Sequence, residues 1–342
     1  MSVVPAIHAE KLSKSYRRRV KQAGLLGAFK GVFSSKSVEV PAVRGLDFII
    51  QPGEAVGLIG ENGAGKSTTV KMLTGILVPS QGSVTVLGRV PSRERQKLAI
   101  EIGVVFGQRP QLLWDIAVRE TFTLLKAMYK IPPEIFSTTS AKVVQLLDLE
   151  PLLDIPVRQL SLGQRMRCDL AAAFLHAPKI AFLDEPTIGL DVVAKEQARE
   201  LIRFMNKTFG STILLTTHDV KDITETCERV ILLDKGGLLF DGSLTAFEEK
   251  FASERRLIAD LEHPLPQEER AGLEALIAQA GGKILHWEPQ RLSVAYTDRA
   301  ALIELNRLLL SKLDVADFTL ERVEVEEIVR NIYTNQQRER LA

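Results

Sequence analysis

The chain has 342 residues, a formal net charge of +1 and 45% hydrophobic residues, which together predict two globular domains. A charge so close to zero gives no general reason to expect nucleic-acid binding. The two cysteines, Cys168 and Cys227, are too few for a disulfide framework, so both are expected to be packing residues in a reducing cytosol. Neither a secretory leader nor about 18 uncharged apolar residues in a row is present, so we expect contact with a membrane only through a partner.

Short apolar runs separated by turn residues predict strands up to residue 110. These runs are Ala6–Ala9, Val43–Ile50, Ala55–Ile59, Ser83–Leu87 and Gly103–Phe106. The apolar spacing then becomes helical, most clearly at Ala117–Tyr129 and Thr139–Leu149. We therefore predict a helical subdomain at about residues 109–172.

The alternation of strands and helices returns after this insert. The predicted elements are strands at Ile180–Leu183, Thr212–Thr217 and Val230–Leu233, with helices at Ala194–Phe209 and Val220–Cys227. Strands that alternate with helices indicate a parallel sheet. The fold class is thus α/β, and residues 1–245 form its first domain.

Residues 246–342 predict a small accessory domain of a different, α+β kind. Its predicted strands and helices, in the order of a β-α-β-β-α-β ferredoxin-like sandwich with one further helix, are Leu257–Leu261, Gln267–Ala280, Lys283–Trp287, Arg291–Tyr296, Arg299–Leu310, Val315–Leu320 and Glu324–Tyr333. Trp287 and Tyr296 are expected in its core. Because this region has no cysteine and no glycine loop that opens a helix, we expect it to regulate or dimerise rather than catalyse.

A glycine-rich segment carries the first chemical signal. Gly60 to Ser67 match the phosphate-loop pattern G-x-x-x-x-G-K-[S/T] at every fixed position, after a predicted strand and before a predicted helix. Its glycines let backbone N–H groups approach phosphate oxygens at the positive end of the helix. The alternative, a turn that merely caps a helix, does not explain this order of elements. The expected nucleotide-binding residues here are Gly60, Glu61, Asn62, Gly63, Ala64, Gly65, Lys66, Ser67 and Thr68.

Residues elsewhere in the chain complete a possible ATPase site together with the phosphate loop. Lys66 would reach the β- and γ-phosphates, and the Ser67 hydroxyl would bind Mg²⁺. Asp184 and Glu185 end an apolar strand, where Asp184 would lie beside Mg²⁺ and Glu185 would polarise the attacking water. A solvated strand end is the alternative for this pair.

Gln108 and His218 each follow a predicted strand. Gln108 could sense Mg²⁺ and the γ-phosphate, and His218 could hydrogen-bond the terminal phosphate. Either one taken alone could equally be an ordinary polar residue. The expected catalytic residues are Glu185, His218, Lys66 and Gln108, and the expected metal ligands are Ser67, Gln108 and Asp184.

The segment Leu160–Arg167, with the sequence LSLGQRMR, makes a resemblance specific. The chain resembles the ATPase subunit of ABC transporters, a P-loop NTPase family whose ATPase domain contains a helical subdomain. The matching parts, in the family's order, are Tyr16, Gly60–Ser67, Gln108, Leu160–Gln164, Asp184 with Glu185, Gly189–Asp191 and His218. The resemblance covers about residues 5–245 and implies that the chain binds ATP with Mg²⁺ and hydrolyses it.

The family's dimer gives further residues a role by resemblance. Two subunits, identical or related, would hold two ATP molecules head to tail, so that isolated subunits hydrolyse ATP poorly. By this resemblance Ser161, Gly163 and Gln164 bind nucleotide, because the helix that begins near Gln164 would face the γ-phosphate held by the other subunit. Asp191 is also assigned to nucleotide binding. Tyr16 would stack on adenine.

The sequence departs from the family's pattern in two places. Leu162 stands where the signature usually has glycine, which could slow hydrolysis by restricting the backbone. Residues 17–41 look like an insertion, in which basic residues precede one apolar helix face formed by Leu25, Leu26, Phe29, Val32 and Phe33. This face could pack on its own domain or contact a membrane partner.

The resemblance implies an ATPase subunit on the cytoplasmic face of the plasma membrane, energising an exporter with separate integral-membrane permease subunits of the ABC-2 type. Leu112, Leu113 and Trp114 are the expected groove for a partner helix, and a buried hinge is the alternative. The signature string and the tail Leu320–Val329 resemble that group. A polysaccharide or glycolipid exporter ATPase is the alternative, and a regulatory ABC ATPase a further one. Two-cassette translation proteins and coiled-coil chromosome ATPases fit the single, compact cassette poorly.

Overall fold

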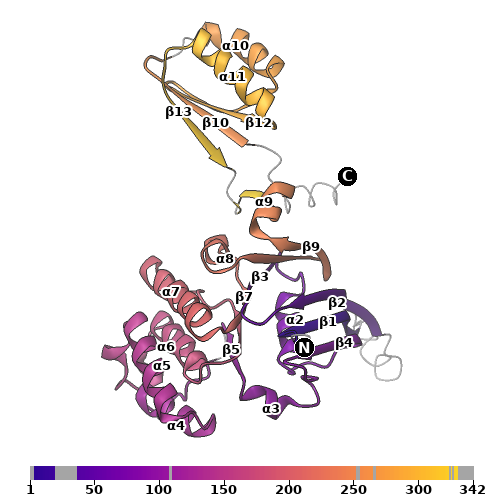
Figure 1. Cartoon of the computed structure of the whole chain (residues 1–342), viewed down its shortest axis with the longest axis vertical. Coiled ribbons are helices and arrows are strands. Elements are labelled where there is room, and N and C mark those ends of the chain that lie inside the picture. The colour runs from indigo at the N-terminus through magenta and orange to yellow at the C-terminus, as the bar shows by residue number, and fades with distance from the viewer. Residues whose placement is uncertain are drawn as a thin grey trace, which may run out of the picture. The chain divides into compact units, whose positions relative to one another are not determined.

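The computed structural model describes residues 4–19, 37–107, 110–251, 255–264, 267–322, 325 and 327–329. The chain divides into two compact units, Met1–Leu244 and Thr245–Ala342, each of which is described by itself (Figure 1). Within the described residues, no helix is both long and apolar enough to cross a bilayer.

A six-stranded sheet forms the centre of the first unit, in the order β5-β6-β7-β3-β8-β9. Its strands are β3 (Ala55–Gly60), β5 (Ile102–Phe106), β6 (Ile180–Asp184), β7 (Thr212–Thr216), β8 (Arg229–Asp234) and β9 (Gly237–Ser243). All pairs are parallel except β8 with β9, an edge strand that the sequence did not predict. Every residue of β3, β6 and β7 is buried, as expected of apolar strands covered on both faces.

A three-stranded antiparallel sheet, β2-β1-β4, completes the first unit's core. Its strands are β1 (Ile7–Arg19), β2 (Ser37–Ile50) and β4 (Gln81–Val86). Both long strands exceed their predicted lengths, because Arg17 pairs with Glu39 and Arg19 with Ser37. Residues 17–19 and 37–41 therefore continue this ladder instead of belonging to an insertion. The helix expected at Leu25–Phe33 lies outside the described residues.

Helices surround the two sheets of the first unit, with α4, α5 and α6 gathered away from β1, β2 and β4 (Figure 1). They are α2 (Lys66–Leu73), α3 (Arg95–Ala99), α4 (Val118–Met128), α5 (Pro133–Leu146), α6 (Leu162–Phe174), α7 (Val192–Phe209) and α8 (Val220–Thr226), with 3-10 turns at Glu150–Leu152 and Val157–Gln159. The prediction placed α5 too late, since the helix already begins at Pro133, where a proline suits the first helical turn.

The second unit has the predicted β-α-β-β-α-β order. After α9 (Leu244–Phe251), which spans the boundary between the units, its elements are β10 (Arg255–Leu261), α10 (Gln267–Gln279), β11 (Gly282–Glu288), β12 (Arg291–Tyr296), α11 (Arg299–Lys312) and β13 (Val315–Arg322). The antiparallel sheet has the order β11-β12-β10-β13. Tyr296 is buried in its core and Trp287 packs against that core half-buried. Of the last predicted helix only residues 325 and 327–329 are described, and they are helical.

Candidate functional site

The parallel sheet brings the predicted site residues to one edge. The strands β3, β5, β6 and β7 are parallel neighbours, so their carboxyl ends meet at the same side of the sheet. The segments that leave this edge contain the phosphate loop, Gly107, Glu185 and His218. Ligands of open α/β sheets bind at such an edge.

The phosphate loop has a backbone that only glycine fits at two positions. Gly60 and Gly65 have φ values of 159° and 102°. A Cβ on Gly60 would lie 2.7 Å from the carbonyl oxygen of Leu233, and one on Gly65 would lie 2.6 Å from that of Ala42. Gly65 is also the N-cap of α2, so the loop leads directly into a helix N-terminus. This geometry supplies backbone N–H donors and a positive dipole end for an anion.

Lys66 lies folded over the loop that carries it. Its side chain is buried, and Nζ donates to the carbonyl oxygens of Gly60 at 2.6 Å and Glu61 at 3.2 Å. Burial lowers the pKa of Lys66, and the nearby carboxylates of Glu185 and Asp184 partly oppose that shift. A buried ammonium beside a helix N-terminus attracts negative charge. Around it, Ala64 and Gly65 are buried, Glu61, Ser67 and Thr68 are half-buried, and Asn62 and Gly63 are exposed.

Asp184 joins the acidic strand to the phosphate loop. Its Oδ1 accepts hydrogen bonds from the Ser67 hydroxyl at 3.2 Å and from the Thr216 hydroxyl at 2.5 Å. In the described ranges, no group of three or more His, Cys, Asp and Glu side chains could hold a metal ion by itself. One hydroxyl and one carboxylate fit Mg²⁺, which usually keeps waters and takes further oxygens from substrate phosphates.

Glu185 and His218 face each other across this edge. Glu185 Oε1 lies 3.0 Å from His218 Nε2, with the Glu185 side chain 21% and the His218 side chain 50% exposed. Glu185 has a φ of 57°, unusual for a residue with a Cβ, and its N–H donates to the carbonyl of Thr216 at 2.9 Å. Burial raises the pKa of Glu185, against an opposing effect of Lys66. Burial and the Lys66 charge lower the pKa of His218, so its imidazole is neutral near pH 7.

A pocket of about 380 Å³ opens beside Ser67, Asp184 and Glu185, and neither Lys66 nor His218 lines it. Its lining residues are Ser67, Lys71, Ile76, Phe106, Gly107, Asp184, Glu185 and Ile188. The N–H of Gly107 donates to the carbonyl of Asp184 at 2.9 Å, which fixes the start of the loop after β5. Gln108, the predicted residue of that loop, lies outside the described residues.

The signature residues lie at the start of α6. The Ser161 hydroxyl accepts from the N–H of Gln164 at 3.2 Å, and the Gln164 side chain accepts from the N–H of Ser161 at 2.9 Å. This capping box starts the helix at Leu162, slightly before the expected start near Gln164. Gly163 follows in the first turn, and none of these residues lines the pocket beside Lys66.

Leu162, the unusual signature residue, lies against the loop that follows Glu185. It is 52% exposed, and a Cβ on Gly189 would be only 3.1 Å from its Cδ2. At the end of that loop Asp191 caps α7 by accepting from the N–H of Ala194 at 2.9 Å. The carboxylate of Asp191 is thus already engaged in a structural bond within its own chain.

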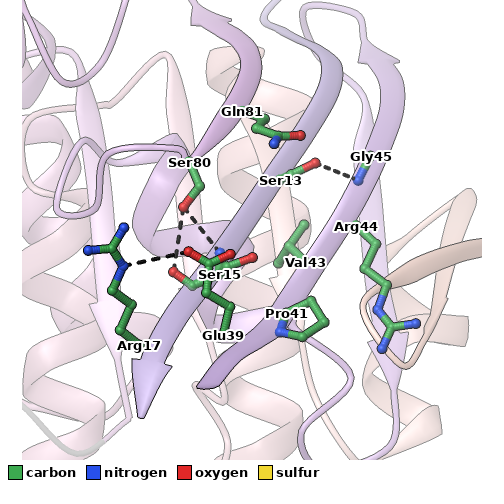
Figure 2. A pocket seen from close by; sticks show the side chains of 10 residues that line it. All are labelled: Ser13, Ser15, Arg17, Glu39, Pro41, Val43, Arg44, Gly45, Ser80 and Gln81. Atoms are coloured by element: carbon green, nitrogen blue, oxygen red, sulfur yellow. Dashed lines mark hydrogen bonds and ion pairs between the residues drawn. The ribbon is translucent and has the colours of Figure 1, made fainter. Parts of the chain in front are cut away.

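Tyr16 lies in β1, where it is 42% exposed and Lys14 Nζ is 5.8 Å from the centre of its ring. A larger pocket of about 700 Å³ lies on the other face of this strand (Figure 2). Ser15 and Arg17 line it, and since neighbours in a strand point to opposite faces, Tyr16 points away. Arg17 is paired with Glu39 there at 3.6 Å. This pocket therefore gathers none of the predicted nucleotide-binding residues.

Comparison with known proteins gives this arrangement a family. The family model described as ABC transporter matches residues 43–188. The chain is 33% identical to the Nod factor export ATP-binding protein I of Rhizobium sp. (strain N33) over 292 residues, 82% of this chain and 92% of that protein. The chain belongs to the ATP-binding subunits of ABC transporters.

Other relatives of this ABC ATPase serve transport in different directions. This chain is 34% identical to the methionine import ATP-binding protein MetN of Geobacillus kaustophilus (strain HTA426), over 62% of this chain and 63% of that protein. Among solved structures it resembles the dimeric cassette MJ0796, bound to ADP and Pi in a post-hydrolysis state, with 25% identity, a TM-score of 0.58, and coverage of 70% of this chain and 98% of that chain. The chain is therefore an ATPase with the ATP-binding cassette fold.

Three polar residues of this ABC ATPase site escaped the sequence analysis. The Thr216 hydroxyl donates to Asp184. Asp222 accepts from the hydroxyls of Thr187 and Thr217. Asp169 accepts from the N–H groups of Gln111 and Leu112 at 2.8 and 3.3 Å. Each lies in an ordinary strand or helix pattern, without a motif of its own. Only the packing of separate elements reveals their roles.

Proposed function

We propose that this ABC ATPase binds Mg²⁺ with ATP at the edge of its parallel sheet and hydrolyses ATP to energise an ABC-2-type exporter. The observation that carries the catalytic part is the convergence of Lys66, Ser67, Asp184, Glu185 and His218 at one edge. We assign ATPase function to residues 1–245 and an accessory, regulatory or dimerising function to residues 246–342. The helical subdomain would occupy residues 109–172.

The chain's own groups hold the nucleotide in this proposal. The N–H groups of the phosphate loop and the Lys66 ammonium bind the β- and γ-phosphates, and Tyr16 stacks on adenine. Ser67 and Asp184, with Gln108, would hold Mg²⁺, which supplies positive charge to the phosphate oxygens when bound.

Hydrolysis then requires a base beside the phosphate. Glu185 accepts a proton from water as the water oxygen bonds to the γ-phosphorus, and the bond from that phosphorus to the bridging oxygen breaks to give ADP and phosphate. The raised pKa of Glu185 suits a carboxylate that must take up this proton. The neutral imidazole of His218 has one N–H, which can donate to the Glu185 carboxylate 3.0 Å away or, when ATP is bound, to the γ-phosphate.

A second ATPase subunit, identical or related, would complete the site. Ser161, Gly163 and Gln164 stand at a helix N-terminus, where they are suited to the γ-phosphate of a partner's nucleotide, with Asp191 at the same interface. Exposed apolar side chains occur at Leu162 and in the segment around Gly189 that Leu162 contacts, namely Ile188, Val192 and Val193. Such a cluster is what a protein interface covers.

Separate membrane subunits at the cytoplasmic face of the plasma membrane would receive the motion of this dimer. In the segment after the loop that contains Gln108, Leu113 and Trp114 are 44% and 50% exposed, whereas Leu112 is buried. Because Leu112 is buried, it fixes the position of the exposed Leu113 and Trp114, whose apolar side chains could pack against a helix of the partner. The export direction is supported by the signature string and by the Nod factor relative, while the methionine import relatives favour the opposite direction.

Transport direction can be measured in inside-out membrane vesicles that contain this chain with the integral-membrane proteins encoded by neighbouring genes. An exporter should accumulate its compound inside such vesicles only with ATP outside. Glu185→Gln should abolish the accumulation, whereas Glu94→Gln, which removes a carboxylate paired with Lys97 of α3, should not. ATP-dependent release of preloaded compound would instead identify an importer and overturn the exporter assignment.

A further inference from the structure

Asp222 is a charged side chain in the interior of the first unit. It lies in the first turn of α8 and is completely buried. Arg199 of α7, itself 3% exposed, donates from Nε to its Oδ1 at 2.8 Å. A buried carboxylate is costly unless it is paired and hydrogen-bonded, and the arginine meets only part of that requirement.

The second carboxylate oxygen of Asp222 joins two loops of the proposed active site. Oδ2 accepts from the Thr187 hydroxyl at 2.5 Å and from the Thr217 hydroxyl at 2.9 Å. Thr187 lies two residues after Glu185, and Thr217 directly precedes His218. The Thr217 oxygen also accepts from the N–H of Asp219 at 3.0 Å, which fixes the turn that carries His218.

These bonds add to two other restraints, the Glu185 N–H bond to the Thr216 carbonyl and the contact between Glu185 and His218. The His218 side chain is 50% exposed, so its position depends on its backbone more than on packing. Glu185 has a left-handed backbone that persists only where its surroundings hold it. Catalysis is sensitive to such placement, since a shift of about 1 Å can cost about 10²-fold in rate.

We propose that Asp222 is a positioning residue that sets the distance between the Glu185 and His218 loops during ATP hydrolysis. This inference rests on the proposed roles of Glu185 and His218. Asp222 does not line the nucleotide pocket, and its hydrogen bonds reach the two loops through Thr187 and Thr217. The competing explanation is that the Arg199 pair merely fastens α8 to α7.

Removing the threonine hydroxyls one at a time separates these explanations. Thr187→Val and Thr217→Val each delete one donor to Asp222. Thr226→Val is the matched control, because the equally buried Thr226 hydroxyl donates to the Asp222 backbone carbonyl at 2.5 Å and joins neither loop. On the full-length chain we expect kcat to fall about 10- to 100-fold in the two test variants. ATP affinity and melting temperature should match the control, and Thr187→Ser should restore turnover.

Glu185→Gln, assayed in parallel, distinguishes failure of this inference from failure of the proposed function. If Glu185→Gln is inactive while Thr187→Val and Thr217→Val turn over like Thr226→Val, Asp222 is only structural and the inference is wrong. The same conclusion follows if the test variants lose more thermal stability than the control and Thr187→Ser does not recover. If Glu185→Gln keeps parental turnover, the proposed function fails first and the inference with it.

Discussion

The two units of this ABC ATPase both pack helices on a sheet, yet they bury different side chains. In the described residues, all buried charged side chains lie in the first unit, and they are Lys66, Asp169, Asp184, Arg199 and Asp222. The buried side chains of the described part of the second unit are apolar except for Tyr296. Because buried charge is unfavourable without dedicated partners, its concentration in the first unit supports the placement of the proposed nucleotide site there.

Sheet topology explains why only one unit collects such groups. The parallel strands of the first unit release their loops at a common edge, so residues distant in sequence meet there. The second unit's sheet is antiparallel, and the connected strands β11 and β12 run in opposite directions. Its loops are therefore divided between the two ends of the sheet, and a compact apolar core results.

Substituting the proposed base would have the largest effect. Glu185→Gln should lower ATP turnover about 10²- to 10⁴-fold, the usual contribution of a positioned base, while ATP binding is preserved and nucleotide-bound dimers accumulate. Steady-state hydrolysis with saturating Mg²⁺, together with size-exclusion chromatography, measures both quantities. Glu94→Gln is the control, since that carboxylate pairs with Lys97 of α3 and does not line the pocket. Parental hydrolysis by Glu185→Gln would remove Glu185 as the base.

Lys66→Ala should act on binding rather than on the chemical step. It removes a buried cation whose hydrogen bonds to charged phosphates are worth about 1.5–3 kcal/mol, or about 10- to 100-fold in affinity. Calorimetric titration with ATP on this variant and on Lys97→Ala, an exposed lysine of α3, gives the comparison. Undiminished ATP affinity would contradict the assignment of Lys66 to the phosphates.

The parts of the site that could be predicted are those whose residues are adjacent in the sequence. The phosphate loop and the acidic strand end each lie in one short segment, whose backbone chemistry fixes its structure. The length of β1 was missed because residues such as Lys11 and Lys14 break the apolar alternation. Lys14 pairs with Val43 of β2, whereas Lys11 lies at an irregularity of the ladder, where its N–H donates to Asp47 Oδ1 at 2.8 Å. Asp222 was missed since its partners come from three separate elements that meet only after packing.

Asp169 offers a test of charge burial that does not depend on catalysis. Burial raises the pKa of Asp169 to about 6, above the usual value of about 3.9. At pH values between these two pKa values, the folded chain binds more protons at Asp169 than the unfolded chain does. The charged carboxylate therefore lowers the free energy of unfolding as pH rises. Asp169→Asn keeps an oxygen acceptor for Gln111 and Leu112 but removes the charge.

The expected result is a stability difference that grows with pH in favour of Asp169→Asn. Between about pH 4 and pH 6 it should increase by up to about 3 kcal/mol, as measured by denaturant unfolding at several pH values. Asp154→Asn is the control, because Asp154 is exposed and Arg119 lowers its pKa. A difference that stays constant across this range would show that Asp169 is not held in a raised-pKa environment.

Removing the second unit should have the smallest effect on the nucleotide site. The proposed ATP-binding residues all lie before Leu244, and the last strand of the first unit, β9, ends at Ser243. Truncation after residue 245 should therefore leave ATP affinity within about twofold, a change below about 0.5 kcal/mol. A second truncation after Phe251, which keeps α9 whole, controls for damage to that helix. Circular dichroism establishes that each fragment folds before titration. Loss of ATP binding by both folded fragments would mean that the second unit, despite its apolar core, contributes to the nucleotide site. The site would then not be confined to the first unit.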